Sequence, residues 1–216
     1  MSVPDYWARA CAELAAEDQV LAGLMRQFDA SILRTRGEPF ETLLRAIVGQ
    51  QISIAAADAI WGRLAQLAPL QQPQAVLAPL QQPQAVLALT PEALRLAGLS
   101  QRKVEYVQDL ARHFADGHLD AARLATLDDE AVIAELTAVR GIGRWSAEMF
   151  LIFNLLRPDV WPVDDIGLQK AVARCYGLDA VPKQAALRQL GERWRPWRTV
   201  ACWYFWRSLD AVEVLY

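Results

Sequence analysis

Apolar residues recur at helical spacing along most of the chain, and no stretch shows the alternation that a half-buried strand would require. Glycine, proline and N-capping residues divide this pattern into segments of helical length. The segments predicted to be helical are 6–25, 40–48, 52–67, 91–97, 102–115, 128–139, 145–155, 166–175, 183–193 and 199–208. We therefore expect an all-α fold in two lobes. Its central buried helix should be 145–155, which is apolar nearly all round.

The ten residues APLQQPQAVL occur twice without change, at 68–77 and 78–87. This unit is too short and too rich in proline to be a solenoid repeat. Surface connections tolerate insertion, so we expect the duplication to lengthen a loop over 68–87. The alternative, that the longer loop contacts a binding partner, has no support in the sequence.

Length and composition narrow the class of protein. The chain has 216 residues, of which 54% are hydrophobic, enough for one sizeable domain or two lobes. It lacks an apolar run of about 18 residues, so no membrane span is expected. The N-terminal residues lack the long apolar stretch of a signal peptide. Three widely separated cysteines support no zinc or iron–sulfur site and fit a reducing cytoplasm.

The most distinctive chemistry lies in the segment 136–171. Gly141 and Gly143 flank one apolar residue between two amphipathic segments. Glycine at both positions permits a tight turn and the close approach of another backbone. A helix starting near Arg144 would offer free N–H groups and the positive end of its dipole, which together bind anions. Such a turn suits nucleic-acid phosphate, although a short glycine motif can also do no more than close a helix hairpin.

Two aspartates, Asp164 and Asp165, precede the predicted helix 166–175. The dipole at a helix N-terminus favours the ionised form of a carboxylate. An ionised carboxylate can stabilise a positively charged transition state or activate water. Capping the helix is the commoner role of aspartate at this position. The residues alone do not separate the two roles.

Three motifs resemble the helix-hairpin-helix DNA glycosylase superfamily, and within it the 3-methyladenine DNA glycosylase II branch. LTAVRGIGRWSAEMFL, followed by WPVDD, is similar to the hairpin and catalytic aspartate of that superfamily. The stretch 40–53 is similar to the early helix and turn of the branch, and RWRPWR at 193–198 to a motif near its end. The motifs occur in the family's order and cover most of 40–207.

The resemblance implies a single two-lobed catalytic unit over 1–216, without the N-terminal β domain of longer relatives. It implies a monofunctional DNA glycosylase of base excision repair, acting on double-stranded DNA. Such an enzyme flips out alkylated purines, including 3-methyladenine and 7-methylguanine, and releases them by hydrolysis to leave an abasic site. The chain is then expected to be a monomer that needs no cofactor, located in the cytoplasm at the nucleoid.

The same resemblance assigns the catalytic residue and the base pocket. It selects Asp165 as catalytic and leaves Asp164 as the helix cap. Trp145 stands where bifunctional relatives carry a lysine that attacks the sugar; tryptophan cannot form a Schiff base, which implies a monofunctional enzyme. Trp145 and Trp206 match aromatic pocket positions, and aromatic faces attract cationic bases. Met149 stands where a relative has tyrosine, which puts the substrate range in question.

Most of the remaining tryptophans are expected to pack in the core. They are Trp7, Trp61, Trp161, Trp194, Trp197 and Trp203.

The turn Gly49-Gln50-Gln51-Ile52 matches the wedge that fills the gap left by a flipped base, with Gln51 at the inserting position. Some relatives have leucine there, whereas glutamine can hydrogen-bond the widowed base. Without the resemblance, an inert surface turn explains these residues equally well.

The resemblance also implies contacts between the hairpin and DNA phosphate. The expected phosphate contacts are Gly141, Gly143, Arg144 and Ser146. In relatives, hairpin carbonyls hold a monovalent cation, and the matching carbonyls for a structural Na⁺ or K⁺ are those of Thr137, Val139 and Ile142. Arg140 replaces the usual proline before the first glycine, which loosens the loop but adds a charge near DNA.

The net charge of −3 is unusual for a DNA-binding protein, so the charges must be segregated on the surface. Modest, salt-sensitive DNA affinity is expected. Two other functions stay open. One is a glycosylase for another damaged base, such as a deaminated purine or uracil. The other is a non-catalytic helix-hairpin-helix DNA-binding protein, which would need neither Asp165 nor an aromatic pocket.

Overall fold

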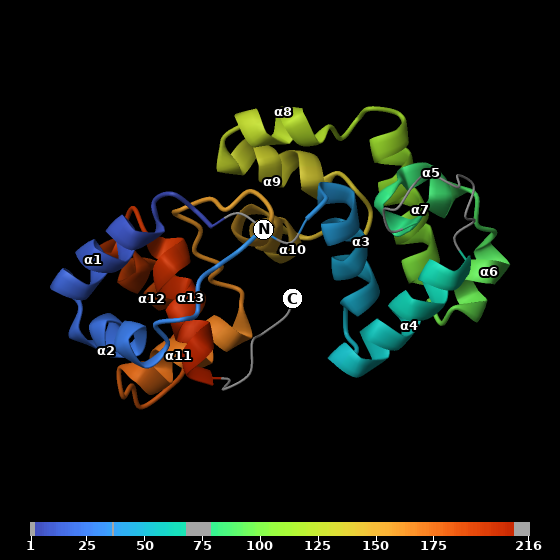
Figure 1. Ribbon diagram of the computed structural model, residues 1–216. Helices are drawn as coiled ribbons and strands as arrows, with labels where there is room; N and C mark the ends of the chain where they lie inside the picture. Colours follow the sequence, from blue (N-terminus) through green and yellow to red (C-terminus); the bar gives the residue numbers. More distant parts are fainter. Residues whose placement is uncertain (1–2, 36, 68–78, 210–216) are drawn as a thin grey trace. The chain divides into compact units, whose positions relative to one another are not determined.

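The computed structural model describes residues 3–35, 37–67 and 79–209, which contain helices and no strand. They divide into two compact units, Met1–Arg36 with Leu151–Tyr216, and Gly37–Phe150. The expected all-α, two-lobed fold is therefore confirmed (Figure 1). No helix in the described part of the chain is long and apolar enough to cross a membrane.

Unit 1 is built around its last helix. Its helices are α1 (Trp7–Glu17), α2 (Gln19–Gln27), α11 (Ile166–Cys175), α12 (Gln184–Gly191), the short 3₁₀ helix η2 (Glu192–Trp194) and α13 (Arg198–Leu209). Helix α13 is buried from Thr199 to Arg207 and contacts α11, α2 and α1. Beside it, the ring of Trp194 lies 5.0 Å from the rings of both Trp161 and Phe205.

The single helix expected over 6–25 is two helices, because Asp18 breaks it. Asp18 has an extended backbone, and its Oδ1 accepts hydrogen bonds from the backbone N–H groups of Val20 (2.9 Å) and Leu21 (3.2 Å). Its Oδ2 accepts from the Tyr176 hydroxyl (2.5 Å) and the Trp194 indole (3.0 Å). Asp18 thus starts α2 and fastens it to the aromatic rings of Tyr176 and Trp194. The Asp18 side chain is only 4% exposed.

Unit 2 carries the remaining helices, with α7 at its centre. They are α3 (Pro39–Gly49), α4 (Ile54–Leu67), η1 (Pro79–Gln81), α5 (Pro83–Leu87), α6 (Pro91–Leu96), α7 (Gln101–Ala115), α8 (Ala121–Thr126), α9 (Asp129–Thr137) and most of α10 (Arg144–Phe153). Helix α7 contacts α3, α5 and α6. Helix α10 is buried from Ser146 onward, in line with the expectation of a buried helix over 145–155.

The duplicated segment is only partly described, since 68–78 lie outside the described residues. The second copy is not the surface loop that the sequence suggests. Its residues form η1 and α5, and Leu80 and Val86 are each only 2% exposed. Pro83 starts α5 at a position where proline is well tolerated. Leu80 and Val86 are buried in unit 2, whereas Leu87 is exposed. The loop prediction is therefore wrong for 79–87.

Candidate active site

Asp165 is the N-cap of α11. Its Oδ1 accepts hydrogen bonds from the backbone N–H of Leu168 (2.5 Å) and from the indole N–H of Trp206 (2.8 Å). The side chain is only 6% exposed. Two donors from separate elements, α11 and α13, fix the direction of this carboxylate. Asp165 is therefore the helix cap, and its catalytic role stays a prediction.

The assignment of Asp164 as the helix cap is wrong. Asp164 is exposed, and its Oδ1 accepts a hydrogen bond from the side-chain amide of Gln184 instead. The reason is geometric. The backbone N–H of Asp165 bonds to the carbonyl of Pro162 (3.0 Å), and the helix begins at Ile166. Only the residue directly before the helix can direct its side chain to the first free N–H groups.

Trp206 and Gly167 enclose the Asp165 carboxylate within unit 1. The Trp206 ring stacks on Phe153, with centroids 5.8 Å apart and an interplanar angle of 16°, and the residue is 2% exposed. A Cβ atom added at Gly167 would lie 3.0 Å from Asp165 Oδ1 and 3.6 Å from the Trp206 ring. Glycine at this position therefore leaves room for the bond between the indole and the carboxylate.

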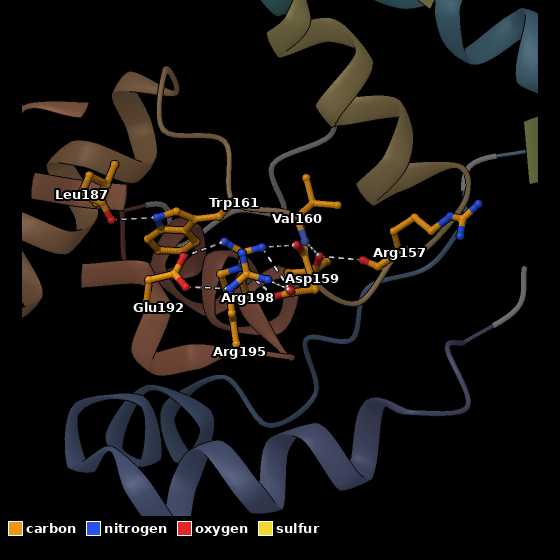
Figure 2. Close-up of polar contacts among 9 residues, drawn as sticks. Arg157, Asp159, Val160, Trp161, Leu187, Glu192, Arg195 and Arg198 are labelled. Carbon is orange, nitrogen blue, oxygen red and sulfur yellow. Dashed lines mark hydrogen bonds and ion pairs between the residues drawn. The ribbon is translucent and has the colours of Figure 1, made fainter. Parts of the chain in front are cut away.

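The segment leading to Asp165 is fastened to the start of α13 (Figure 2). Arg198 donates two hydrogen bonds to the Asp159 carboxylate, at 2.6 and 3.0 Å, and Arg195 donates another at 2.8 Å. The Thr199 hydroxyl donates to the carbonyl of Arg157 (2.6 Å) and accepts from the N–H of Val160 (3.0 Å). The arginines of the RWRPWR motif, together with Thr199, thus anchor the segment of chain that leads to Asp165.

Trp161 fixes the same segment from the other side. Its indole N–H donates to the carbonyl of Leu187 at 2.9 Å, as Figure 2 shows. A Cβ atom at Gly191 would lie only 2.4 Å from the Trp161 ring nitrogen.

The expectation that most of the remaining tryptophans pack in the core is also confirmed. Those that are buried are Trp7, Trp161, Trp194, Trp197 and Trp203.

The glycine hairpin lies in unit 2, between the end of α9 and the start of α10. Gly141 has a φ of +86°, a region that favours glycine. A Cβ atom at Gly141 would lie 2.3 Å from the Tyr106 ring on α7, so the aromatic ring fills the space that a side chain would need. Gly143 is exposed and has open space around it. The first glycine therefore serves packing, and the second leaves the turn open.

The hairpin arginines are engaged by acids in this structure. Arg144 donates two hydrogen bonds to Glu130, at 2.5 and 3.0 Å, and one to Glu148 at 3.1 Å. Hydrogen bonding to Glu130 raises the pKa of Arg144, and the same bond lowers the pKa of Glu130. Arg140 likewise donates to Glu105 at 3.0 Å. A phosphate at Arg144 would have to compete with carboxylates for the guanidinium.

The other hairpin candidates differ in exposure. Ser146 is 7% exposed, which places it on the buried side of α10.

Among the three carbonyls matched to a cation, that of Val139 accepts the N–H of Ile142 at 3.1 Å. Thr137 is the last residue of α9, where helix carbonyls lack intrahelical partners. In the described part of the chain, no group of three or more His, Cys, Asp or Glu side chains is arranged to hold a metal.

Gln51 lies on an exposed turn directly after α3, with a φ of +58°. The side-chain amide of its neighbour Gln50 donates to the carbonyl of Gly141 at 2.9 Å. The structure therefore joins the wedge turn to the glycine hairpin, although the two are about ninety residues apart in sequence. Nothing in the two sequence motifs indicates this bond.

The candidate pocket residues fall in different units. Trp145 is partly exposed, and Met149, one turn later on α10, is 6% exposed; both belong to unit 2. Asp165 and Trp206 belong to unit 1. The contacts thus form two groups, Asp165 with Trp206, and the wedge turn with the hairpin.

The fold is that of a family of DNA repair proteins. Residues 44–196 match the family described as HhH-GPD superfamily base excision DNA repair protein. The match spans most of the chain, and the chain belongs to this family.

The names of individual relatives are more specific than the description of the family. The chain is 33% identical over 175 residues to DNA-3-methyladenine glycosylase 1 of Schizosaccharomyces pombe, covering 79% of this chain and 72% of the relative. A crystal structure of DNA-3-methyladenine glycosidase from Bacillus halodurans is similar with a TM-score of 0.81 and 36% identity, covering 98% of this chain and 94% of that one. The S. pombe Mag1 complex with abasic DNA has a TM-score of 0.79 and 30% identity, covering 94% and 98%.

Proposed function

We propose that this chain is a monofunctional DNA-3-methyladenine glycosylase II, which removes alkylated purines from double-stranded DNA. The observation that carries the proposal is the buried Asp165 carboxylate, held at the start of α11 by Trp206 and a backbone N–H. Membership of a base excision repair family and similarity to 3-methyladenine glycosylases support the substrate class. A DNA-binding protein without activity would need neither an aspartate at the position that matches the family's catalytic residue nor the aromatic residues at the pocket positions.

The proposed reaction starts from a base that already carries positive charge. The bond between C1′ and N9 of 3-methyladenine breaks, and its electron pair stays on the base and neutralises it. The deoxyribose becomes cationic, and the Asp165 carboxylate stabilises that charge. Water adds to C1′ and loses a proton, which leaves an abasic site. A cationic base leaves without a general acid, so a single carboxylate suffices.

The base must first leave the helix, which costs a few kcal/mol. We assign Gln51 as the wedge that fills the gap, because it is exposed at the tip of the turn after α3. Trp145, Met149 and Trp206 are assigned to the base pocket. Trp145 cannot form a Schiff base, so the product is an intact abasic strand rather than a cleaved one.

Phosphate binding is assigned to the open side of the hairpin. Gly143 and the first turn of α10 provide backbone N–H groups for an anion, and Gly141, Arg144 and Ser146 complete the proposed set. The burial of Ser146 and the carboxylate partners of Arg144 favour the backbone as the main contact. Carboxylates thus pair with both hairpin arginines, Arg140 and Arg144.

The reaction requires no cofactor. We assign the hairpin carbonyls of Thr137, Val139 and Ile142 as the site for a Na⁺ or K⁺ ion. The bond that Val139 already accepts leaves its carbonyl a second lone pair for such an ion. A bound ion would add positive charge beside the phosphate. We place the protein as a monomer on cytoplasmic, nucleoid DNA.

The test is base release from duplex DNA treated with a methylating agent, comparing the wild type with Asp165→Asn. Release of 3-methyladenine by the wild type alone supports both the activity and the residue. Full activity in the variant would reject Asp165. If neither protein releases a base but DNA binding persists, duplexes with uracil and deaminated purines distinguish another lesion from a binding-only role. A protein–DNA adduct trapped by borohydride would contradict the monofunctional assignment.

A further inference from the structure

The turn that carries Gln51 has a costly backbone conformation. Gln51 is not glycine, yet its φ of +58° lies in the left-handed region. Residues other than glycine are strained there and persist only where their surroundings enforce the conformation. The turn's own backbone bonds are long, 3.3 Å from Gln50 N–H to the Ile47 carbonyl and 3.4 Å from Ile52 N–H to that of Gly49. Another group must therefore stabilise the turn.

Lys103, on the first turn of α7, is that group. Its Nζ donates hydrogen bonds of 2.7 Å to two carbonyls, those of Val48 and Gln50. The last carbonyls of a helix lack partners within the helix and carry its negative end, so an ammonium group suits the end of α3. Partial burial lowers the pKa of Lys103. The two acceptors flank the last residue of α3 and fix the backbone that leads into Gln51.

The same helix also fixes the hairpin. The Tyr106 ring, three residues after Lys103, lies against Gly141, and the Asp109 carboxylate accepts the N–H of Arg140 at 2.9 Å. The Gln50 amide then joins the turn to the carbonyl of Gly141. Helix α7 thus contacts both turns within unit 2. Lys103 contacts the wedge turn, and Tyr106 and Asp109 contact the hairpin.

We infer that Lys103 is a positioning residue that holds the Gln51 wedge turn in its inserting conformation before DNA binds. This inference rests on the proposed function of Gln51. A turn that is already formed need not be ordered during base flipping, so the wedge enters the gap at a lower cost. The ammonium group of Lys103 serves the protein backbone in this role and makes no contact with DNA phosphate.

The variant to compare is Lys103→Met, which keeps the length of the side chain and removes the ammonium group. Arg102→Met is the matched control, because Arg102 is the exposed neighbour on the same helix and its loss changes the net charge equally. Lys103→Arg keeps a charged donor and should recover part of any loss. Thermal unfolding of each variant establishes that the proteins compared are folded.

The first readout is single-turnover release of 7-methylguanine placed opposite cytosine or opposite a mismatched base. A mismatched base is already easier to unstack. We expect Lys103→Met to slow release from the paired site about tenfold and from the mismatched site about twofold, because less wedge action is needed there. Equal slowing at both sites would mean general damage to the fold and would overturn the inference, as would unchanged rates.

The second readout needs no catalysis. In a duplex with an abasic analogue, a neighbouring 2-aminopurine brightens when a wedge unstacks it. At saturation, Lys103→Met should give a smaller increase than the wild type and Arg102→Met. Equal brightness in all three would overturn the inference. If the wild type brightens the probe but releases no base, the proposed activity fails while the role of Lys103 is still decided.

The salt dependence of DNA affinity separates positioning from phosphate contact. Loss of a phosphate-binding lysine lowers the slope of log K against log salt by about one unit. Lys103→Met should leave this slope unchanged. A reduced slope would assign Lys103 to phosphate and would overturn the inference.

Discussion

Two buried aspartates in unit 1, Asp18 and Asp165, look alike in local chemistry and differ in their surroundings. Each caps a helix, each accepts a tryptophan indole N–H, and they are 4% and 6% exposed. Both oxygens of Asp18 accept hydrogen bonds, and Arg193 lies 3.5 Å from its Oδ2. The Leu168 and Trp206 bonds to Asp165 both reach one oxygen, Oδ1.

The sequence positions of their partners differ as well. Asp18 is bonded to Tyr176 and Trp194, which are more than 150 residues away, so it joins the first part of unit 1 to the last. Asp165 is presented by a segment that Arg198 and Trp161 hold in place. Burial and capping therefore do not identify a reactive carboxylate. We predict that Asp18 serves stability and that Asp165 serves the proposed reaction, and variants can test that division.

The largest expected effect is that of Asp165→Asn on rate. Loss of the charge should lower single-turnover base release roughly a thousandfold. Asparagine is as good an N-cap as aspartate and its oxygen can still accept from Leu168 and Trp206. The free energy of unfolding should therefore change by less than about 1 kcal/mol. Urea denaturation and excision assays on the same preparation measure both. A large loss of stability with normal activity would reverse the division.

Asp18→Asn should show the opposite pattern. The amide would direct N–H groups toward the donors of Tyr176 and Trp194, and Arg193 would lose its counter-charge. We expect a loss of about 3 kcal/mol in the free energy of unfolding. The excision rate per folded molecule should stay within about twofold, since the site is unchanged. The exposed neighbour Glu17, changed to Gln, is the control. A rate that falls with Asp18→Asn in fully folded protein would assign it to the site.

Trp206→Phe tests the indole bond to Asp165. Phenylalanine still stacks on Phe153 but donates no hydrogen bond, so the carboxylate loses one of its two described donors. We expect release to slow about tenfold. Trp203→Phe is the matched control on the same helix, because the Trp203 indole donates to the carbonyl of Ser31 at 2.9 Å instead. The two variants should lose similar stability, and equal rates would show that the indole of Trp206 does not orient Asp165.

A smaller effect is expected for Gly167→Ala. The added Cβ would lie 3.0 Å from Asp165 Oδ1, so the carboxylate must shift by a few tenths of an ångström. Release should slow about threefold, because catalysis depends on the position of the acid. Gly23→Ala, where nothing lies within 4 Å of an added Cβ, is the control and should only stabilise α2. Equal rates in both variants would mean that the site tolerates the shift.

The pH dependence of stability should distinguish Asp18 further. Burial alone would raise its pKa, but the hydrogen bonds from Tyr176, Trp194, Leu21 and Val20 outweigh burial and lower it. A lowered folded pKa contributes stability that is complete above the unfolded pKa of about 3.9 and is lost as pH falls through the folded value. The stability difference between wild type and Asp18→Asn should therefore shrink below about pH 4. Urea titrations of both proteins at pH 7, 4 and 3 would measure this stability difference. A difference that stays constant with pH would contradict the stabilising role of the Asp18 carboxylate.

The sequence predicted the helices well where caps and breaks are local. Thr90 and Asp128 are of residue types that cap helices, and they cap α6 and α9 close to the predicted starts at 91 and 128. The helix 166–175 was predicted to the residue. Helix α8 was missed, and the break at Asp18 was missed because the apolar pattern continues through it. A lone aspartate within an amphipathic pattern is a weak signal unless its distant partners are known.

The site was predicted in part. The resemblance selected Asp165, and the structure places it in a buried, oriented position. The roles of Gly167, Asp159 and Lys103 were not foreseen, because each depends on contacts between segments distant in sequence. The Arg144 bonds to Glu130 and Glu148 were also not foreseen, although the spacing from Arg144 to Glu148 is that of neighbours on a helix. That spacing was the one available signal.

The exact duplication of APLQQPQAVL has a consequence for a chain that loses one copy. Because the copies at 68–77 and 78–87 are identical, deletion of either one gives the same protein sequence. The shortened chain would still contain the leucine and valine that are buried as Leu80 and Val86, directly before the same following residues. Loss of one unit therefore keeps the residues that are buried in unit 2, and the first copy is the part of the chain that a deletion can remove.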